Sequence, residues 1–288
     1  MSTEETQPEA EAAPPTVDRV EQAERFRAFH EGSEPLLLPN AWDAGSAKLL
    51  VSLGFNAVAT TSSGFAASLG RLDGSALDDE ALANAAVIVK AAGAAPVSAD
   101  LENGFADEPS NIRVTMLNAL SVGLSGCSIE DYTGRADDPI YDAKFAAERV
   151  AAAAAIAHRG PVRIVLTARA ENFLHGRPDL DDTIARLQGY QEAGADVLYA
   201  PGLTSLDDIR SVVTSVDRPV NVLALPDGPT VAELTEAGVR RISVGGAFAF
   251  AAYGAMIEAA REFLEKGTYG YGSRAQVGRS AVREYFGR

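Results

Sequence analysis

The feature that most constrains the fold of this chain is a regular alternation of short apolar, β-branched runs with Ala-rich amphipathic stretches. Runs that are apolar on both faces and alternate with helices are typical of a parallel sheet that helices cover. Eight such units over roughly 250 residues predict an α/β fold, a (βα)8 barrel of the TIM type. The predicted strands span residues 36–40, 57–61, 96–101, 126–131, 163–169, 197–200, 220–225 and 241–245.

The predicted helices lie between these strands and carry residues that suit helix ends. They span residues 44–53, 78–92, 109–122, 142–158, 181–193, 205–214, 230–237 and 247–265. A glycine, which tolerates the left-handed conformation that often ends a helix, follows four of them: Gly93, Gly123, Gly194 and Gly238. Asp43 is predicted to cap the first helix. An open doubly wound sheet is the alternative fold, but no GxGxxG motif follows the first strand to support it.

The two ends of the chain differ in composition from its middle. Residues 1–20 are rich in Glu, Pro, Ala and Thr without periodicity, which predicts a disordered acidic tail. Residues 269–288 contain four arginines and one glutamate and form a basic C-terminal extension. The predicted catalytic domain, a single barrel, therefore spans residues 21–268.

Charge and cysteine content limit the partners and the compartment. Lys and Arg number 25 against 40 Asp and Glu, a net charge of −15, so we expect neither nucleic-acid nor membrane binding. An anionic ligand would need a local cation, either a metal ion or an arginine. Cys127 is the only cysteine, which excludes an internal disulfide. No signal peptide or apolar run of membrane-spanning length is visible, and we predict a cytoplasmic protein.

Acidic side chains gather where predicted strands end, which is where a barrel of this type carries its chemistry. Asp100 and Glu102 are two residues apart, so an extended segment points both to one face, and Glu130 ends the next strand. Three carboxylates at one mouth repel one another unless a cation lies among them. Mg²⁺, with Mn²⁺ as an alternative, fits this oxygen-rich set. Each acid taken alone would equally suit a helix cap.

Other polar residues at the same strand ends suit an anionic ligand. Arg169 ends an apolar strand and could clamp a carboxylate or a phosphonate, or else form a salt bridge with Glu171. The Ser62-Ser63-Gly64 segment, interpreted as a turn, could offer hydroxyl and N–H donors, and Gly64 would allow close approach. Asn221 lies in the seventh predicted strand.

These residues, in this order, resemble the isocitrate lyase/phosphoenolpyruvate mutase family. The resemblance covers roughly residues 30–265 and is carried by PNAWDAGSAKLL, TTSSGFAASLGRLDG, VSADLENGF, GLSGCSIEDYTG, LTARAENFL and YQEAGADVLYAPGL. It implies a (βα)8 barrel whose C-terminal helix is swapped between the subunits of a homodimer or homotetramer. It also implies a Mg²⁺ requirement and a small anionic 2-oxo or 2-hydroxy carboxylate as substrate.

The resemblance also implies roles for individual residues. The matching positions place Asp100, Glu102 and Glu130 at the metal, partly through water molecules. They place Ser63, Gly64 and Phe65 at the substrate, and we expect Asn221, from its place in the seventh predicted strand, to bind the substrate as well. They mark Arg169, Asp73 and Glu130 as catalytic, with Asp73 on a gating loop and Arg169 in contact with the substrate.

One stretch departs from the family pattern. Lyases of the family carry a Lys-Lys-Cys-Gly-His-type loop after the fourth strand, whereas residues 131–139 read DYTGRADDP. The missing Cys and His argue against isocitrate or methylisocitrate cleavage. We therefore expect a Mg²⁺-dependent lyase that acts through a pyruvate-type enolate, by C–C cleavage or decarboxylation. The alternatives are phosphoenolpyruvate mutase or phosphonopyruvate hydrolase chemistry at a C–P bond, and a non-catalytic dicarboxylate-binding or scaffold protein.

Overall fold

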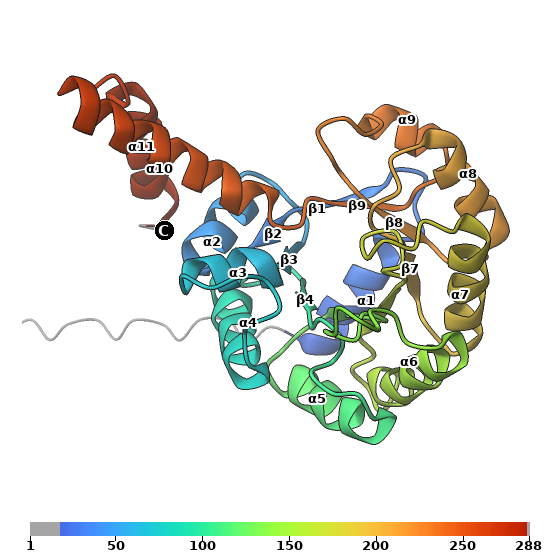
Figure 1. Ribbon diagram of the computed structural model, residues 1–288. Helices are drawn as coiled ribbons and strands as arrows, with labels where there is room; N and C mark the ends of the chain where they lie inside the picture. Colours follow the sequence, from blue (N-terminus) through green and yellow to red (C-terminus); the bar gives the residue numbers. More distant parts are fainter. Residues whose placement is uncertain (1–17, 287–288) are drawn as a thin grey trace, which may run out of the picture.

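A computed structural model describes residues 18–286 as a barrel of parallel strands with helices around it (Figure 1). The strands are β1 (Leu36–Leu38), β2 (Asn40–Ala41), β3 (Val58–Thr60), β4 (Val97–Asp100), β5 (Gly126–Glu130), β6 (Val165–Arg169), β7 (Val197–Tyr199), β8 (Val220–Leu223) and β9 (Arg241–Ser243). The helices of the ring are α2 (Ala44–Ser52), α3 (Ser62–Ser68), α4 (Asp78–Ala92), α5 (Pro109–Ser121), α6 (Ala143–Ala157), α7 (Leu180–Glu192), α8 (Leu206–Ser215) and α9 (Val231–Glu236). The predicted barrel is confirmed.

The barrel closes through its first strand, which Pro39 divides into two parts. β1 pairs with β9, and β2 pairs with β3, so that the sheet returns to its own edge. Proline has no N–H to donate, which suits this break in the ladder, but the Pro39 carbonyl still accepts a bond from the Ala59 amide at 2.9 Å. The eight predicted strands thus form a closed sheet, and the open doubly wound alternative is excluded.

The N-terminal end of the barrel is sealed by a helix that the sequence pattern did not predict. This helix, α1 (Arg19–Ala28), begins after Asp18, whose carboxylate accepts hydrogen bonds from the next turn. Residues 18–20 therefore belong to the ordered helix and its cap rather than to the predicted tail. Residues 1–17 lie outside the described part of the chain.

Phe26 of α1 is fully buried and packs with apolar strand residues at the floor of the barrel. A Cβ atom placed on Gly126 would lie 2.6 Å from the Phe26 ring and 2.9 Å from the Val165 carbonyl oxygen. Glycine at this position lets the aromatic ring approach the β5 backbone. The floor is therefore a dry layer, and polar groups are left for the opposite end of the barrel.

A helical arm leaves the barrel after β9. It consists of α10 (Ala247–Lys266) and α11 (Gly272–Phe286), and Figure 1 shows it projecting to one side of the ring. Ala249 is the one buried residue of α10, and α11 has none among its described residues. Large apolar side chains such as Phe263 and Leu264 are 58% and 86% exposed. Within residues 18–286, no helix combines the length and apolar character needed to cross a membrane.

We predict that Phe26→Ala lowers the free energy of unfolding by about 3–5 kcal/mol, because the variant leaves a cavity at the dry floor. Urea denaturation followed by circular dichroism measures this change. Leu117→Ala on α5, where the side chain is 50% exposed, serves as the control and should change stability by less than about 0.5 kcal/mol. Equal effects in the two variants would contradict the sealing role of Phe26.

Candidate active site at the carboxyl ends of the strands

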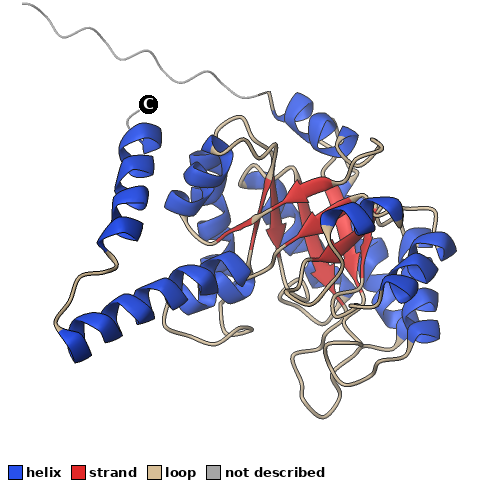
Figure 2. Ribbon diagram, turned by 90° about the horizontal axis from the view of Figure 1, so that it is seen from above, coloured by secondary structure: helices blue, strands red, loops and turns tan. Residues whose placement is uncertain are grey.

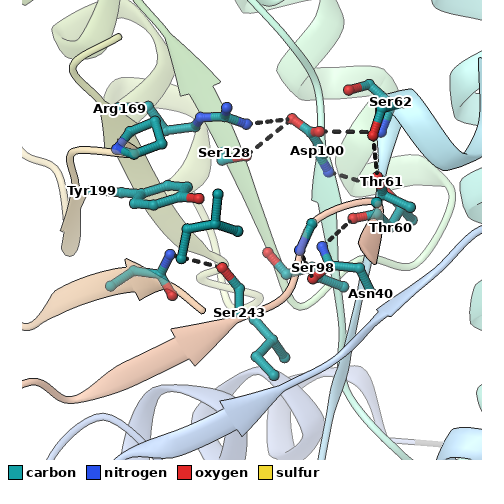
Figure 3. Close-up of a pocket in the computed structure, with 18 of the residues that line it drawn as sticks. Asn40, Thr60, Thr61, Ser62, Ser98, Asp100, Ser128, Arg169, Tyr199 and Ser243 are labelled. Atoms are coloured by element: carbon teal, nitrogen blue, oxygen red, sulfur yellow. Dashed lines mark hydrogen bonds and ion pairs between the residues drawn. The ribbon is translucent and has the colours of Figure 1, made fainter. Parts of the chain in front are cut away.

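A cavity of about 170 Å³ opens at the carboxyl ends of the strands, inside the ring of helices that Figure 1 shows. Figure 2 shows the same barrel from its side, with the strands between the helices. Its described lining includes the predicted residues Ser63, Asp73, Asp100, Arg169 and Asn221. Figure 3 shows that the side chains of Asp100 and Arg169 point toward each other and form an ion pair at the edge of this space. The strand ends thus bring together residues that lie up to about 160 positions apart in the sequence, as expected for this type of barrel.

The Arg169 guanidinium is surrounded by three carboxylates. Its Nη1 lies 3.0 Å from Asp100 Oδ1, its Nη2 lies 3.3 Å from Glu130 Oε2, and its Nε lies 2.8 Å from Glu171 Oε1. The Tyr199 ring, absent from the sequence prediction, lies under the guanidinium at 5.1 Å. The salt bridge to Glu171, one of the two interpretations drawn from the sequence, is therefore present. Every nitrogen of Arg169 has an acidic partner before any ligand binds.

One arginine does not balance the negative charge at this mouth. Burial raises the pKa of Glu130 well above its usual value and also raises that of Glu171, while Arg169 opposes both shifts. Glu102 has no ion pair among the described residues, and its pKa rises to about 7 through burial and the nearby charges of Asp100 and Asp73. Like charges held this close favour either protonation or an added cation.

Asp73 and Glu102 also border a second, outer hollow of about 500 Å³, which Glu130 and Tyr132 help to line. Asp73 lines both spaces, in agreement with its predicted place beside the site. Among residues 18–286, no three Asp, Glu, His or Cys side chains stand together closely enough to hold a metal ion directly. A cation at this mouth would therefore have to keep several of its water molecules, as Mg²⁺ commonly does.

The Ser62-Ser63-Gly64 segment is the first turn of helix α3, so its interpretation as an isolated turn was wrong. Thr61 caps this helix by accepting a hydrogen bond from the Gly64 amide at 3.3 Å. The Ser62 amide donates to Asp100 Oδ2 at 3.2 Å, which ties the start of the helix to the acidic cluster. The N-cap signal was present in the sequence as Thr61 before a short apolar stretch.

The three predicted substrate-binding residues of α3 differ in position. Ser63 lines the cavity, and its hydroxyl lies 3.1 Å from that of Thr61. Gly64 is buried, and a Cβ atom there would lie 3.1 Å from the side chain of Ala249 and 3.3 Å from that of Trp42. The missing side chain thus makes room for α10 and for the Thr61 side chain, whose Cγ2 would lie 2.7 Å from the added Cβ. Phe65 is half-buried and borders a small space next to Asp100 and Glu102.

Asn221 lies deeper in the cavity, in contact with an arginine that the sequence analysis did not single out. The Asn221 amide donates to Ser243 Oγ at 3.0 Å, and its carbonyl oxygen accepts from Arg241 Nε at 3.0 Å. Arg241 and Ser243 alternate with the outward-facing Ile242 in β9. Polar residues at both inward positions of a strand were the signal for this part of the site.

The segment that departs from the family pattern is held by its own contacts. Asp131 is buried and accepts hydrogen bonds from the Glu171 amide at 2.8 Å and from the Tyr190 hydroxyl at 2.6 Å. The Thr133 hydroxyl accepts from the Arg135 amide at 3.0 Å and donates to the Asp138 carbonyl. The Thr133 hydroxyl therefore makes both of these hydrogen bonds within the loop.

A family model described as phosphoenolpyruvate phosphomutase matches residues 26–264, which covers the whole barrel. The chain belongs to the phosphoenolpyruvate mutase/isocitrate lyase superfamily. Members of this superfamily are carbon–carbon lyases or mutases. The resemblance inferred from the sequence is thereby confirmed.

Several relatives within the superfamily cover most of the chain. A crystal structure from Burkholderia cenocepacia J2315, provisionally described as a lyase/mutase, has a TM-score of 0.89 at 49% identity and covers 92% of this chain and 95% of that one. The structure of 2,3-dimethylmalate lyase has a TM-score of 0.80 at 28% identity, over 89% of this chain and 90% of that one. An uncharacterised protein of Mycobacterium tuberculosis H37Rv is 34% identical over 225 residues, 76% of this chain and 81% of that one.

We predict that Arg169→Met lowers the free energy of unfolding by about 3–5 kcal/mol at pH 8, because three buried carboxylates lose their common cation. The loss should shrink towards pH 5. Without Arg169 the pKa values of Glu130 and Glu171 rise further, and a raised pKa contributes stability at low pH that disappears as the pH rises through it. Urea denaturation across this pH range measures the effect.

Arg210→Met is the matched control for this experiment. Arg210 pairs with Asp207 at 3.4 Å on the surface, where the two side chains are 47% and 92% exposed. Its loss should cost less than about 1 kcal/mol and should vary little with pH. A stable Arg169→Met protein at pH 8 would show that Arg169 does not hold the acidic cluster together.

Proposed function

We propose that this chain is a Mg²⁺-dependent lyase that acts on a small 2-oxo or 2-hydroxy carboxylate through a pyruvate-type enolate. The observation that carries the proposal is the surplus of negative charge at the mouth of the barrel. Glu102 and Glu130 line the outer hollow, Asp100 lines the cavity beside it, and the nearest cation, Arg169, already has three acidic partners. A catalytic metal ion would balance this charge and bind an anionic substrate in an otherwise acidic protein.

In this proposal Asp100, Glu102 and Glu130 hold the metal, mainly through bound water. Mn²⁺ would suit the same donors. Arg169 favours the ionised form of the neighbouring carboxylates, because its charge opposes the rise in their pKa caused by burial. When bound, the metal supplies positive charge where negative charge develops on the substrate's oxo oxygen.

The remaining predicted residues position the substrate and exclude water. The Ser63 hydroxyl lines the cavity beside Asp100 and can donate to a substrate oxygen. Fixed donors aimed at developing charge are each worth about 3–4 kcal/mol of the activation barrier. Asp73 stands on the exposed loop between the two hollows, where the substrate would enter. Gly64 and Phe65 act in this proposal by fixing α3.

Carbon–carbon chemistry is favoured over C–P chemistry by the loop after β5. The Thr133 hydroxyl of this loop donates to the Asp138 carbonyl oxygen and accepts from the Arg135 amide, so it is not free to donate to a phosphonate. The 2,3-dimethylmalate lyase relative, at 28% identity over nearly the whole barrel, supports a lyase on a small hydroxy acid.

We also propose that the helical arm is exchanged between subunits of a homodimer or homotetramer. Of the described residues of α10 and α11 only Ala249 is buried, and α10 exposes Phe250 and Leu264 at 51% and 86%. Exposed apolar surface of this kind marks an interface.

The proposed activity predicts pyruvate release from oxaloacetate or from a branched malate, and loss of that activity after treatment with EDTA. Added Mg²⁺ should restore it. Asp100→Asn should reduce turnover at least 100-fold without unfolding the protein, because a metal-site carboxylate is lost. Asp207→Asn, which removes an equal charge from the exposed surface of α8, should leave turnover unchanged. Lactate dehydrogenase coupling measures the pyruvate.

The other outcomes separate the competing functions. Phosphate released from phosphonopyruvate, or phosphoenolpyruvate formed from it, would replace the lyase by C–P chemistry. Calorimetric binding of Mg²⁺ with oxalate but no turnover of any compound would favour a non-catalytic dicarboxylate-binding protein. Full activity of Asp100→Asn would remove the metal site from the proposal.

The proposed subunit exchange predicts a mass that is twice or four times 30.1 kDa by light scattering. Leu264→Glu should shift the protein towards the monomer, since a charge replaces an apolar side chain at the interface. Leu72→Glu, equally exposed at 86% but outside the arm, should not. A wild-type monomer at micromolar concentration would contradict the exchange.

A further inference from the structure

Arg241, at the start of β9, is a buried cation without a counter-ion. The residue is 4% exposed inside the barrel. Its Nε donates to Asn221 Oδ1 at 3.0 Å, and its Nη2 donates to Thr167 Oγ1 at 2.9 Å. Both partners are neutral. Nη1 is buried as well and has no hydrogen-bond partner among the described residues, which is unusual because buried polar groups are nearly always paired.

No acidic side chain of the described barrel compensates this charge. The pKa of Arg241 falls to about 10 through burial and the like charge of Arg169, opposed by Tyr199. The nearby His30 adds no charge of either sign, because burial and then the charge of Arg241 lower its pKa to about 3. By contrast, the buried Arg186 pairs with Asp131 at 3.2 Å. A buried charge without a partner is strongly unfavourable, so we expect an anion to bind beside the Arg241 guanidinium.

The free nitrogen belongs to a residue that lines the same cavity as Asp100 and Arg169. The lining of this cavity includes hydroxyl and amide side chains, notably Ser98, Ser243 and Asn221. TIM barrels usually fill this layer with bulky branched apolar residues. Here small polar residues leave an open space between a cation and the acidic mouth, and they supply hydrogen-bond donors along it.

We propose that Arg241 binds the second carboxylate of the substrate, so that the substrate is a dicarboxylate. This inference rests on the proposed function and extends it: one end of the substrate reacts at the acidic mouth while the other end points inward to Arg241 and Ser243. One guanidinium balances one carboxylate, whereas a doubly charged phosphonate would leave a buried negative charge. Arg241 is thus a specificity-determining residue, separate from the groups that surround the reacting bond.

The test compares Arg241→Gln with Arg240→Gln. Arg240 is the preceding residue, and its guanidinium donates to the Ser33 and Val239 carbonyl oxygens instead of the cavity. Calorimetry with succinate and propionate, which differ by one carboxylate and do not react, measures the subsite directly. We expect wild type and Arg240→Gln to bind succinate at least tenfold more tightly than propionate. Arg241→Gln should abolish this preference, and Arg241→Lys should keep part of it.

Thermal unfolding separates ligand binding from a structural role. An unpaired buried cation destabilises the empty protein, so Arg241→Gln should have a Tm at or above that of wild type and should lose the rise in Tm caused by succinate. A lower Tm with unchanged succinate preference would make Arg241 a structural residue and overturn the proposal. Equal stabilisation by chloride and by succinate would do the same, since it would reveal a site for any small anion.

The outcome is independent of whether the proposed reaction is correct. If succinate binds through Arg241 but no compound turns over, the subsite stands and the lyase proposal fails. If pyruvate is released and Arg241→Gln leaves both kcat and KM for dicarboxylates unchanged, the lyase stands and the subsite fails. Under both proposals together, Arg241→Gln raises KM for dicarboxylates at least tenfold and has a smaller effect on kcat.

Discussion

The ion pairs of Arg169 are the interaction on which the rest of the site depends. The parallel pairing of β4, β5 and β6 brings their carboxyl ends together and thereby places Asp100, Glu130 and Glu171 around one guanidinium. Removing these charges from water is costly, and their mutual attraction repays it only in this arrangement. In the same arrangement Glu102 has no ion pair among the described residues, and burial with the nearby charges of Asp100 and Asp73 raises its pKa to about 7. The side chain of Arg169 therefore holds the carboxylates at the mouth of the barrel together, but its single positive charge does not balance their negative charge.

The barrel could be predicted from the sequence because its strands are short, apolar and regularly spaced. Two helices, α1 and α3, could not be predicted, because their own sequences carry weak signals and their stability depends on residues distant in the chain. Helix α1 lacks a clear apolar face of its own, and only Phe26 and two small or polar residues become buried in it. Helix α3 is too short to show periodicity. Both helices are stabilised by contacts with the folded barrel. Phe26 of α1 packs against the apolar floor, and the Ser62 amide of α3 donates to the Asp100 carboxylate.

The acids of the site were predictable because three carboxylates at successive strand ends are rarely accidental. Their partners were harder to assign. The sequence allowed Arg169 either a ligand or a salt bridge, and only the fold shows that all its nitrogens face acids. Arg241 resembled an ordinary residue at a strand boundary. Its importance depends on the absence of an acid near it within the described barrel, and a linear sequence does not reveal that kind of absence.

The divided first strand has a consequence for how this protein is made. β1 pairs with β9, whose residues come about two hundred positions later in the chain, and such distant pairing slows folding. During synthesis the edge of β1 has no partner strand until residue 243 has left the ribosome. An open parallel edge invites other strands. The free edge of β1 is thus the part of the sheet that stays unpaired longest during synthesis.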